Sequence, residues 1–509
     1  MVASIFFPPL MPVTASGHII EGSGLFNGSS GVLTRTPSVG NKKTFTISCV
    51  IKRGNVGTPQ SIFASGGGGH TIQAYFHGTG FLIVEDYVGG GVWNLQLNTA
   101  AFFRDPGAWL HIVVKYNSTA STPSASDNGI FINGVQLTDF INTETYPDQN
   151  DESAWNTNTA HHLGNALAGY FNGYAAQFVS VEGQALNADS FGEFTDDGFW
   201  QINDASGLTF GTNGFLIEGG TNVAAGTDSS GNSNNFSKTG TITATNDSPT
   251  NDSANDYGNY ALIRDAGNYV ATISEQSLRS TGATASQASA AISTIPFDVE
   301  DTEGFYVEGQ WLYSDGVTGE GGNFNSIGIV QSNGTIAASG GSIRTASSVS
   351  YQEDGTVHKF NPGSAAQTYA TWGANTGHRP VLFVKAGKIW FGLDKNAGSV
   401  TWNGDPSNGT GEAASGLTGM YNFVAYHYAT AASMRYNFGA IAFLYDPPTG
   451  GKSIHTGKLP TPAIINPAEH FHSVVVAHDG SSTASTCTFN LSTYEWLAII
   501  KNTTGAVEK

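Results

Sequence analysis

The chain has 509 residues, several times the size of one typical hydrophobic core, and is therefore expected to form at least two compact domains. Only 12% of its residues are charged and 65 are glycine, a balance that favours turns and strands over helices with charged surfaces. The formal net charge of -19 would repel phosphate backbones, so we expect no nucleic-acid partner.

The N-terminal residues do not have the pattern of a targeting segment. Residues 1–20 are predicted as an N-terminal extension, which lacks a basic region and is broken by Pro8 and Pro9, unlike a secretory signal. No apolar run has membrane-spanning length, so we expect no membrane insertion. We expect the protein to be made in a cytoplasm. The two cysteines, Cys49 and Cys487, fall in regions predicted as separate domains, and Cys49 is predicted to be a core thiol.

Residues 21–195 carry short β-type runs at the spacing of a β-sandwich. Polar and apolar residues alternate in Phe45–Ile51 and again in Leu110–Tyr116, as in strands with one buried face. Asn133 and Gly134 separate two further runs and supply the positive φ angles that a tight hairpin turn requires. This region is predicted to be one antiparallel sandwich.

The rest of the chain divides by composition. Residues 196–256 are polar and turn-forming, which predicts a linker, although the β-type run 214–218 within it could add a strand to a neighbouring sheet. Strand patterns resume over 257–460 and predict a second sandwich. Residues 461–509 hold too few strands to bury a sheet face alone, and are predicted to begin a further β unit or to form a docking tail.

Eight short motifs follow one another in the first region, each at a predicted strand or corner: Gly24–Asn27, Leu33–Pro37, Lys43–Ser48 with Lys52–Gly54, Phe103–Pro106, Ala108–Val114, Ile132–Val135, Gly169–Tyr174 and Gly183–Leu186. In this order they resemble the laminin-G-like, concanavalin-type jelly rolls of phage structural proteins. Any one of these motifs is weakly specific, whereas the ordered series is specific for the fold.

A second series of motifs follows in residues 257–460: Gly304–Glu308, Gly387–Gly392, Trp402 before Gly404–Pro406, Asn437–Gly439 and Phe443–Gly450, with Leu459–Pro462 after them. It resembles a SPRY-type sandwich. The tandem arrangement is similar to large bacteriophage tail and virion proteins. The resemblance implies an all-β chain with two concanavalin-like antiparallel sandwiches of jelly-roll type in tandem and a short, incomplete C-terminal β unit. It also implies either a polypeptide that continues past Lys509 or a short homologue.

The acidic residues are the candidates for catalytic and metal-binding groups. Glycan-cutting enzymes with concanavalin-type folds carry paired carboxylates on one strand, and no such strand is present, so we expect no catalytic residues and no enzymatic activity. Calcium is the one credible metal, and no other cofactor is expected. Its candidate ligands are Asp148, Asp151 and Glu152 in a polar loop. A second candidate set lies in the linker: Asp228, Asn232 and Asn235.

Exposed tryptophans would suit stacking on sugar rings. Three tryptophans lie beside Gly, Asn or Asp and are the better candidates for ligand binding: Trp93, Trp155 and Trp402. Three others lie within β-rich runs and are predicted to be core: Trp109, Trp311 and Trp390. The adjacent pair His161 and His162 should point to opposite faces of a strand, which makes a shared metal site improbable.

The resemblance implies a bacteriophage virion structural protein, in a tail fibre, spike, or capsid or tail appendage, made in the host cytoplasm. Its sandwiches would adhere to host surface glycans or decorate the particle. Other virion proteins are the expected partners, together with copies of the chain itself in a homo-oligomer, for which a trimer is favoured. Two alternatives stay open from the residues: a glycan-degrading appendage enzyme and a secreted cellular adhesin.

Overall fold

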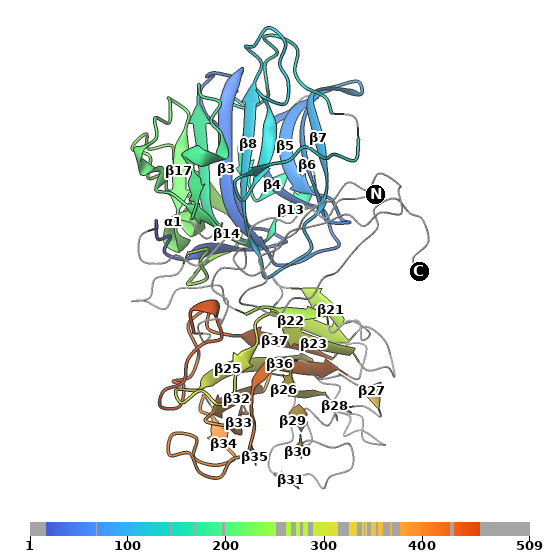
Figure 1. Ribbon diagram of the computed structural model, residues 1–509, viewed down its shortest axis with the longest axis vertical. Coiled ribbons are helices and arrows are strands. Elements are labelled where there is room, and N and C mark those ends of the chain that lie inside the picture. The colour runs from blue at the N-terminus through green and yellow to red at the C-terminus, as the bar shows by residue number, and fades with distance from the viewer. Residues whose placement is uncertain are drawn as a thin grey trace, which may run out of the picture. The chain divides into compact units, whose positions relative to one another are not determined.

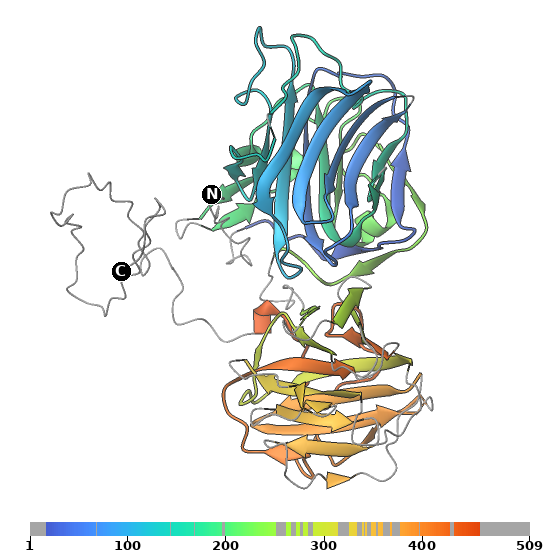
Figure 2. The ribbon, with the colours of Figure 1, turned by 90° about the vertical axis from the view of Figure 1, so that its right-hand side faces the viewer.

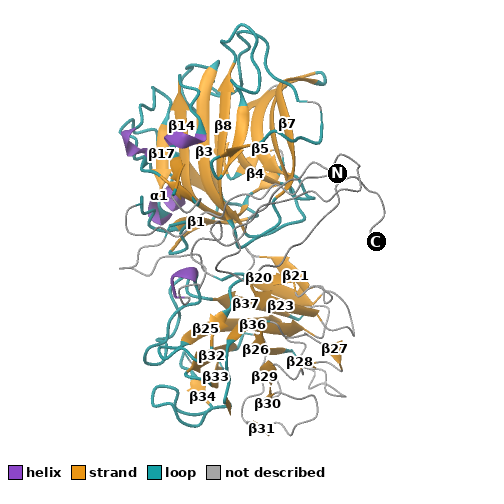
Figure 3. Cartoon of the chain, in the orientation of Figure 1, coloured by secondary structure: helices purple, strands orange, loops and turns teal. Residues whose placement is uncertain are grey.

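The regular secondary structure of the described residues consists mostly of antiparallel strands, which form two β-sandwiches and confirm the expected fold class (Figures 1 and 3). The computed structural model describes residues 17–67, 69–142, 144–166, 168–195, 199–250, 261–265, 271–274, 278–282, 289–313, 325–332, 338–339, 342–343, 348–352, 355–359, 367–368, 377–395, 398–427 and 432–458. The helical elements found there are short: α1 (Gly220–Ala225), η1 (Ala188–Ser190), η2 (Ala205–Gly207) and η3 (Thr456–Lys458).

The first sandwich consists of two sheets, named 1A and 1B. Sheet 1A has the order β10 (Val135–Gln136), β9 (Gly129–Ile132), β8 (Trp109–Asn117), β3 (Thr44–Arg53), β14 (Asn172–Glu182), β1 (Ser23–Asn27) and β19 (Ile242–Thr245), with β17 (Phe215–Glu218) also paired to β14. Sheet 1B has the order β18 (Ser237–Thr239), β2 (Val32–Arg35), β11 (His161–Leu163), β4 (Gln60–Gly67), β5 (His70–Phe76), β6 (Phe81–Gly89) and β7 (Val92–Phe102).

Alternation along the strands builds the core between these two sheets. In β3, Phe45, Ile47, Cys49 and Ile51 point inward and join a buried cluster with residues of sheet 1B such as Phe63. Cys49 is a free, buried thiol, as predicted, and burial raises its pKa. The alternation thus fixes which face of β3 points into the core between the sheets, although its other face, with Ser48 and Val50, is buried as well.

The turn between β9 and β10 has the geometry that its sequence predicts. Asn133 and Gly134 have φ angles of 47° and 81°, and Ile132 pairs with Val135 on either side of them. A Cβ atom added at Gly134 would lie 2.2 Å from the Trp200 ring. Both the positive φ and this close approach therefore require glycine.

Within the segment 196–256, expected as a linker with a possible added strand at 214–218, residues 199–250 complete the first sandwich, and β17 is that added strand. Strand β17 pairs with β14, β18 with β2, and β19 with β1. Val223, Phe236 and Ile242 from this segment are buried in the core between the sheets. A few apolar residues at the right positions are enough to hold the segment in place, although its composition is polar.

The second sandwich also has two sheets, 2A and 2B. Sheet 2A has the order β20 (Ile263–Asp265), β23 (Ser289–Ser293), β36 (Met420–His427), β26 (Ser326–Gln331), β29 (Ser348–Gln352), β30 (Thr356–Lys359) and β31 (Gln367–Thr368), with β24 (Phe297–Asp298) beside β36. Sheet 2B has the order β21 (Ala271–Ser274), β22 (Arg279–Gly282), β37 (Ser433–Asn437), β25 (Phe305–Tyr313), β32 (Arg379–Lys385), β33 (Lys388–Asp394) and β34 (Thr401–Trp402), with β35 (Ala414–Ser415) beside β33.

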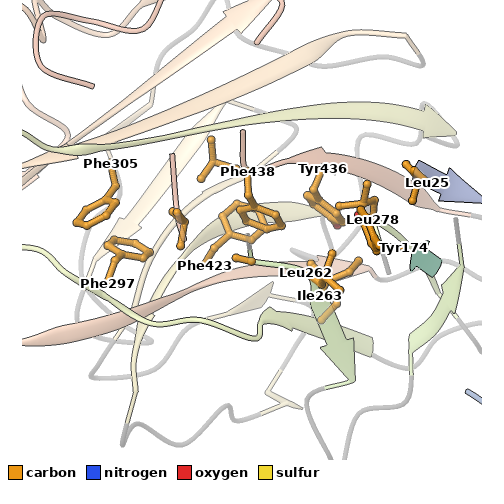
Figure 4. Close-up of a cluster of buried hydrophobic side chains, with 14 of the residues drawn as sticks. Leu25, Tyr174, Leu262, Ile263, Leu278, Phe297, Phe305, Phe423, Tyr436 and Phe438 are labelled. Atoms are coloured by element: carbon orange, nitrogen blue, oxygen red, sulfur yellow. The ribbon is translucent and has the colours of Figure 1, made fainter. Parts of the chain in front are cut away.

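Aromatic side chains from both sheets fill the second core. Phe423 of sheet 2A lies 5.3 Å from Tyr436 and 5.5 Å from Phe438, measured between ring centroids, and Phe297 lies 5.1 Å from Phe305 (Figure 4). The rings of the first two pairs meet edge to face, the arrangement that aromatic quadrupoles favour. Trp311 is buried in this core, Trp390 is buried in a separate small cluster with Tyr306 and Phe383, and Trp109 is buried in the first sandwich, so all three are core residues, as predicted.

Three small hairpins complete the described elements: β12 (Asn165–Ala166) with β13 (Gly169–Tyr170), β15 (Gly192–Phe194) with β16 (Trp200–Ile202), and β27 (Ala338–Ser339) with β28 (Ser342–Ile343). The chain divides at residue 460 into two units, and the predicted further β unit, residues 461–509, lies outside the described residues. Among the helices of the described ranges, none is long and apolar enough to cross a membrane.

Candidate functional site

The outer face of β5, β6 and β7 carries the strongest candidate for a binding surface. Figure 2 turns the sheet that contains these strands toward the viewer. Residues paired across antiparallel strands share a face, and the register places three rows of side chains outward. The rows are Thr71, Tyr87 and Trp93; Gln73, Glu85 and Gln96; and Tyr75, Ile83 and Asn98. We call these three strands with their outward side chains the β5–β7 face.

Glu85 lies at the centre of this face and is held from two sides. The side-chain amide of Gln73 donates to Oε1 of Glu85 at 2.7 Å, and the indole N–H of Trp93 donates to Oε2 at 3.2 Å. Each carboxylate oxygen has room for a further hydrogen bond. The carboxylate is therefore oriented before any ligand arrives, and it can still accept hydrogen bonds from one.

Two aromatic rings stand beside this carboxylate. The rings of Tyr87 and Trp93 lie 5.3 Å apart, and both side chains are partly exposed. The backbone N–H of Gly91 donates to the hydroxyl of Tyr87 at 3.1 Å, which fixes the ring. Trp93, predicted from the sequence as a ligand-binding residue, is thus placed on a face where its ring can contact a ligand.

Tyr75 completes the face on the other side of Glu85. Burial, together with the nearby charge of Glu85, raises the pKa of Tyr75 to about 12. Within the described ranges its hydroxyl has no hydrogen-bond partner, and the side chain is partly exposed. It is a neutral group at physiological pH that is available to a ligand.

The edge of the face is closed by the segment after β10. The backbones of Gln96 and Thr145 exchange two hydrogen bonds, of 3.0 and 3.1 Å. The Asn142 amide donates to Oε1 of Gln96 at 3.3 Å, and its Oδ1 accepts from the backbone of Asn98. The free edge of β7 is thereby paired, which protects it from pairing with another chain.

Trp155, the second predicted ligand-binding tryptophan, is a core residue, and that prediction was wrong. Its side chain is 0% exposed and packs edge to face against Phe63, with ring centroids 5.5 Å apart. Its indole N–H donates to Ser180 at 3.1 Å, so its one polar group is satisfied inside the protein. No sugar can reach this ring.

Trp402, the third, packs on the outer face of sheet 2B. It lies against a small apolar cluster with Tyr306 and Phe443, and the Trp402 and Tyr306 centroids are 6.4 Å apart. Glu308 holds the segment that follows Phe443 against the sheet by accepting hydrogen bonds of 2.9 Å from the backbone N–H groups of Leu444 and Tyr445. Since Trp402 is only partly exposed and its neighbours are apolar, it serves mainly to pack this loop onto the sheet.

Two of the predicted calcium ligands, Asp151 and Glu152, form contacts with neighbouring protein groups. The carboxylate of Glu152 forms an ion pair with Lys42, which lowers its pKa. Asp151 accepts a hydrogen bond of 2.8 Å from the backbone of Asp148. Among the residues that the structure describes, no three His, Cys, Asp or Glu side chains are grouped so that they could hold a metal. Asp148, Asp151 and Glu152 therefore do not form such a carboxylate cluster.

Asp228, from the second calcium set, holds together the loop between α1 and β18. Its two carboxylate oxygens accept hydrogen bonds of 2.7 to 2.9 Å from the backbones of Leu216, Ser230 and Asn234 and from the Ser230 hydroxyl. The amides of Asn232 and Asn235 are also engaged with the backbone. These hydrogen bonds satisfy backbone N–H groups of the loop, and each carboxylate oxygen of Asp228 already accepts two of them.

Buried histidines serve the fold. His161 is buried on β11 while its neighbour His162 is partly exposed, as the alternation predicted. The backbone N–H of Asn156 donates to Nε2 of His161 at 3.0 Å, and burial lowers the pKa of His161 to about 4. His111 accepts the indole N–H of Trp200 at Nδ1 (2.8 Å), and Nε2 therefore donates to Ser48.

Sequence reasoning missed Gln73, Tyr75, Glu85 and Tyr87. The available signal was the alternation in β5 and β6, which predicts one solvent-facing row in each strand. What the alternation leaves open is the pairing register, and only the register brings Glu85 between Gln73 and Trp93.

Comparison with protein-family models and with curated proteins finds no match. Among solved structures, the chain is similar to mouse laminin alpha1 domains LG4-5, at 9% identity and a TM-score of 0.28, over 89% of this chain and 90% of that one. It is also similar to the SPRY domain of human HERC1 (10%, TM-score 0.24, 33% of this chain, 90% of that one). A putative carbohydrate binding protein from Bacteroides ovatus is similar at 14% and a TM-score of 0.26, over 44% of this chain and 59% of that one. These values are too low to carry any argument about ligand or activity.

Proposed function

We propose that this chain is a non-enzymatic structural protein of a bacteriophage virion, within a tail fibre, spike or other appendage, and that its first sandwich attaches the particle to a surface glycan. The virion assignment is supported by the two ordered series of motifs, Gly24–Leu186 and Gly304–Pro462, and their resemblance to phage tail proteins. The glycan assignment is carried by one observation: Glu85 is held between Gln73 and Trp93 on the β5–β7 face.

This arrangement has the parts that sugar recognition needs. A sugar ring presents an apolar face that packs on an aromatic ring, and hydroxyl groups at its rim that need hydrogen-bond acceptors and donors. Trp93 and Tyr87 supply the rings, and Glu85 supplies an oriented acceptor. Because all three lie on paired strands, little conformational freedom is lost when a ligand binds.

Binding should be tested by replacing Trp93 and comparing with a neighbour on the same strand. We expect Trp93→Ala to weaken binding of the purified protein to host surface polysaccharide about tenfold or more, since it removes both the stacking ring and a partner of Glu85. Val92→Ala is the matched control, because Val92 is the neighbour of Trp93 on β7, is 56% exposed and has neither an aromatic ring nor a polar side-chain group. Equal binding by the two variants would contradict the proposed site.

The place in the virion needs a separate test. Antibody against this chain should label purified particles in electron micrographs, and unlabelled particles would refute the virion assignment. As an appendage component made in the host cytoplasm, the chain would assemble with other virion proteins and with copies of itself, with a trimer favoured. A strictly monomeric mass in solution would argue against the oligomer.

A further inference from the structure

The charge that the centre of the β5–β7 face presents to a ligand is negative. The indole N–H of Trp93 and one N–H of the Gln73 amide are directed at Glu85 and are already used. The amide of Gln96, in the same row, is a further neutral donor, while the Glu85 carboxylate keeps acceptor capacity for a ligand. The Tyr75 hydroxyl, which can donate or accept, adds to it.

These strands carry no cationic Lys or Arg side chain that could balance the charge of Glu85. No Lys or Arg occurs between Arg53 and Arg104, a stretch that contains the whole of β4 to β7. The acidic residues in it are Glu85, on the outer face, and Asp86, which is buried and hydrogen-bonded to His70 and Asn94. An anionic group laid on this face would meet a carboxylate and find no Lys or Arg of these strands to pair with.

From this imbalance we infer that the ligand of the β5–β7 face is a neutral or amino-sugar glycan, and that uronic, sialylated and sulfated glycans are rejected. The inference rests on the proposed glycan attachment and adds the substrate class. Hydroxyl and ammonium groups donate hydrogen bonds to Glu85, whereas carboxylates and sulfates are anions that Glu85 repels and that no Lys or Arg of these strands neutralises. Discrimination is therefore built from a repulsive element as well as an attractive one.

The spacing of the rows indicates a short oligosaccharide rather than a single sugar. Tyr75 and Tyr87 belong to rows on opposite sides of the Glu85 row. Four residues along an antiparallel pair span roughly 13 Å. A chain of sugars laid along β6 could therefore contact both aromatic ends of the face with Glu85 at its middle.

The test is a printed array of neutral, amino-sugar and acidic glycans, probed with the full chain and its variants. We expect the wild-type protein to bind neutral or amino-sugar members at least about tenfold better than acidic ones, and Trp93→Ala to lose that binding. Glu85→Arg replaces the acceptor by a cation and should raise the ratio of acidic to neutral binding about tenfold or more. Glu85→Gln, which keeps an acceptor, should move the ratio less.

The control is Glu193→Arg, which changes the net charge equally at an exposed position of β15, away from the β5–β7 face. Similar ratios for Glu193→Arg and Glu85→Arg would overturn the inference, because overall charge would then explain the selectivity. Binding of acidic members that Trp93→Ala abolishes would overturn the inference while supporting glycan attachment. Absence of binding to every member, with all proteins folded by circular dichroism, would overturn the proposed attachment itself.

Discussion

Mild acid should destabilise both sandwiches, because three histidines are buried in their neutral form. Burial lowers the pKa of His111 to about 3, of His161 to about 4 and of His427 to about 3. For His111 and His161, one ring nitrogen already accepts an N–H from Trp200 or Asn156, so a proton placed there would oppose another donor. In the unfolded chain each histidine titrates near its ordinary pKa of about 6.5.

Proton linkage gives the direction in which the free energy of unfolding changes with pH. Below about pH 6.5 the unfolded chain takes up protons that the folded chain refuses, so stability falls as the pH is lowered and is recovered above pH 6.5. Between about pH 7.5 and pH 5.0 each of these histidines should cost about 2 kcal/mol. The first sandwich, with His111 and His161, should lose about 4 kcal/mol and the second, with His427, about 2 kcal/mol. His18, whose pKa is raised by its hydrogen bond to Glu218, opposes this loss in part.

Urea unfolding followed by tryptophan fluorescence at a series of pH values between these limits would measure the effect. The free energy of unfolding should approach a slope of about 1.4 kcal/mol per pH unit for each neutral histidine. The lowered carboxyl pKa values of Asp204 and Asp301 fall below this window, so loss of their stabilisation contributes little in it. Free energies that stay flat from pH 7.5 to pH 5.0 would refute the account of the buried histidines.

Three further predictions concern the first sandwich. Trp155→Ala should lower the free energy of unfolding by about 3 to 5 kcal/mol, whereas Trp93→Ala should lower it by less than about 1 kcal/mol, as measured by urea denaturation. Trp200→Phe leaves Nδ1 of His111 without its donor and should cost about 1 to 3 kcal/mol; a wild-type midpoint would argue against that hydrogen bond. Asp228→Ala should cost about 2 kcal/mol or more and expose its loop to proteolysis, and unchanged cleavage would contradict its role as the loop's organiser.

The strands could be predicted where apolar residues recur with a period of two in the sequence. The alternation of β3 correctly gives the residues that face the core between the sheets, but it does not show that the other face of β3 is buried too. The Asn133–Gly134 turn is a second local signal that describes the structure correctly. In the segment 196–256 the added strand β17 was predicted correctly, whereas the strands β18 and β19 were missed because the polar residues around them suggest a linker. The polar residues of this segment form loops such as the one around Asp228, while its apolar residues Val223 and Ile242 lie in the core.

In the candidate site, too, neighbours in the sequence did not always predict neighbours in space. Trp155 has polar neighbours in the sequence, Ser153 and Asn156, yet it packs in space against Phe45 and Phe63. Trp93 was found because its neighbours are also turn residues, and here the ring is indeed accessible. Glu85 gave no signal of its own, since its role depends on cross-strand partners.

The position of β1 between β14 and β19 has a consequence for how the first sandwich folds. Ser23 meets Thr245 across this pair, 222 residues further along the chain. Contacts of such high sequence separation slow folding, and during synthesis β1 must wait for residues made much later. Until β19 arrives, one edge of β1 is an unpaired template for other strands. We therefore expect nascent or truncated chains that end before β19 to aggregate, and chaperones that shield strand edges to raise the yield of the complete protein.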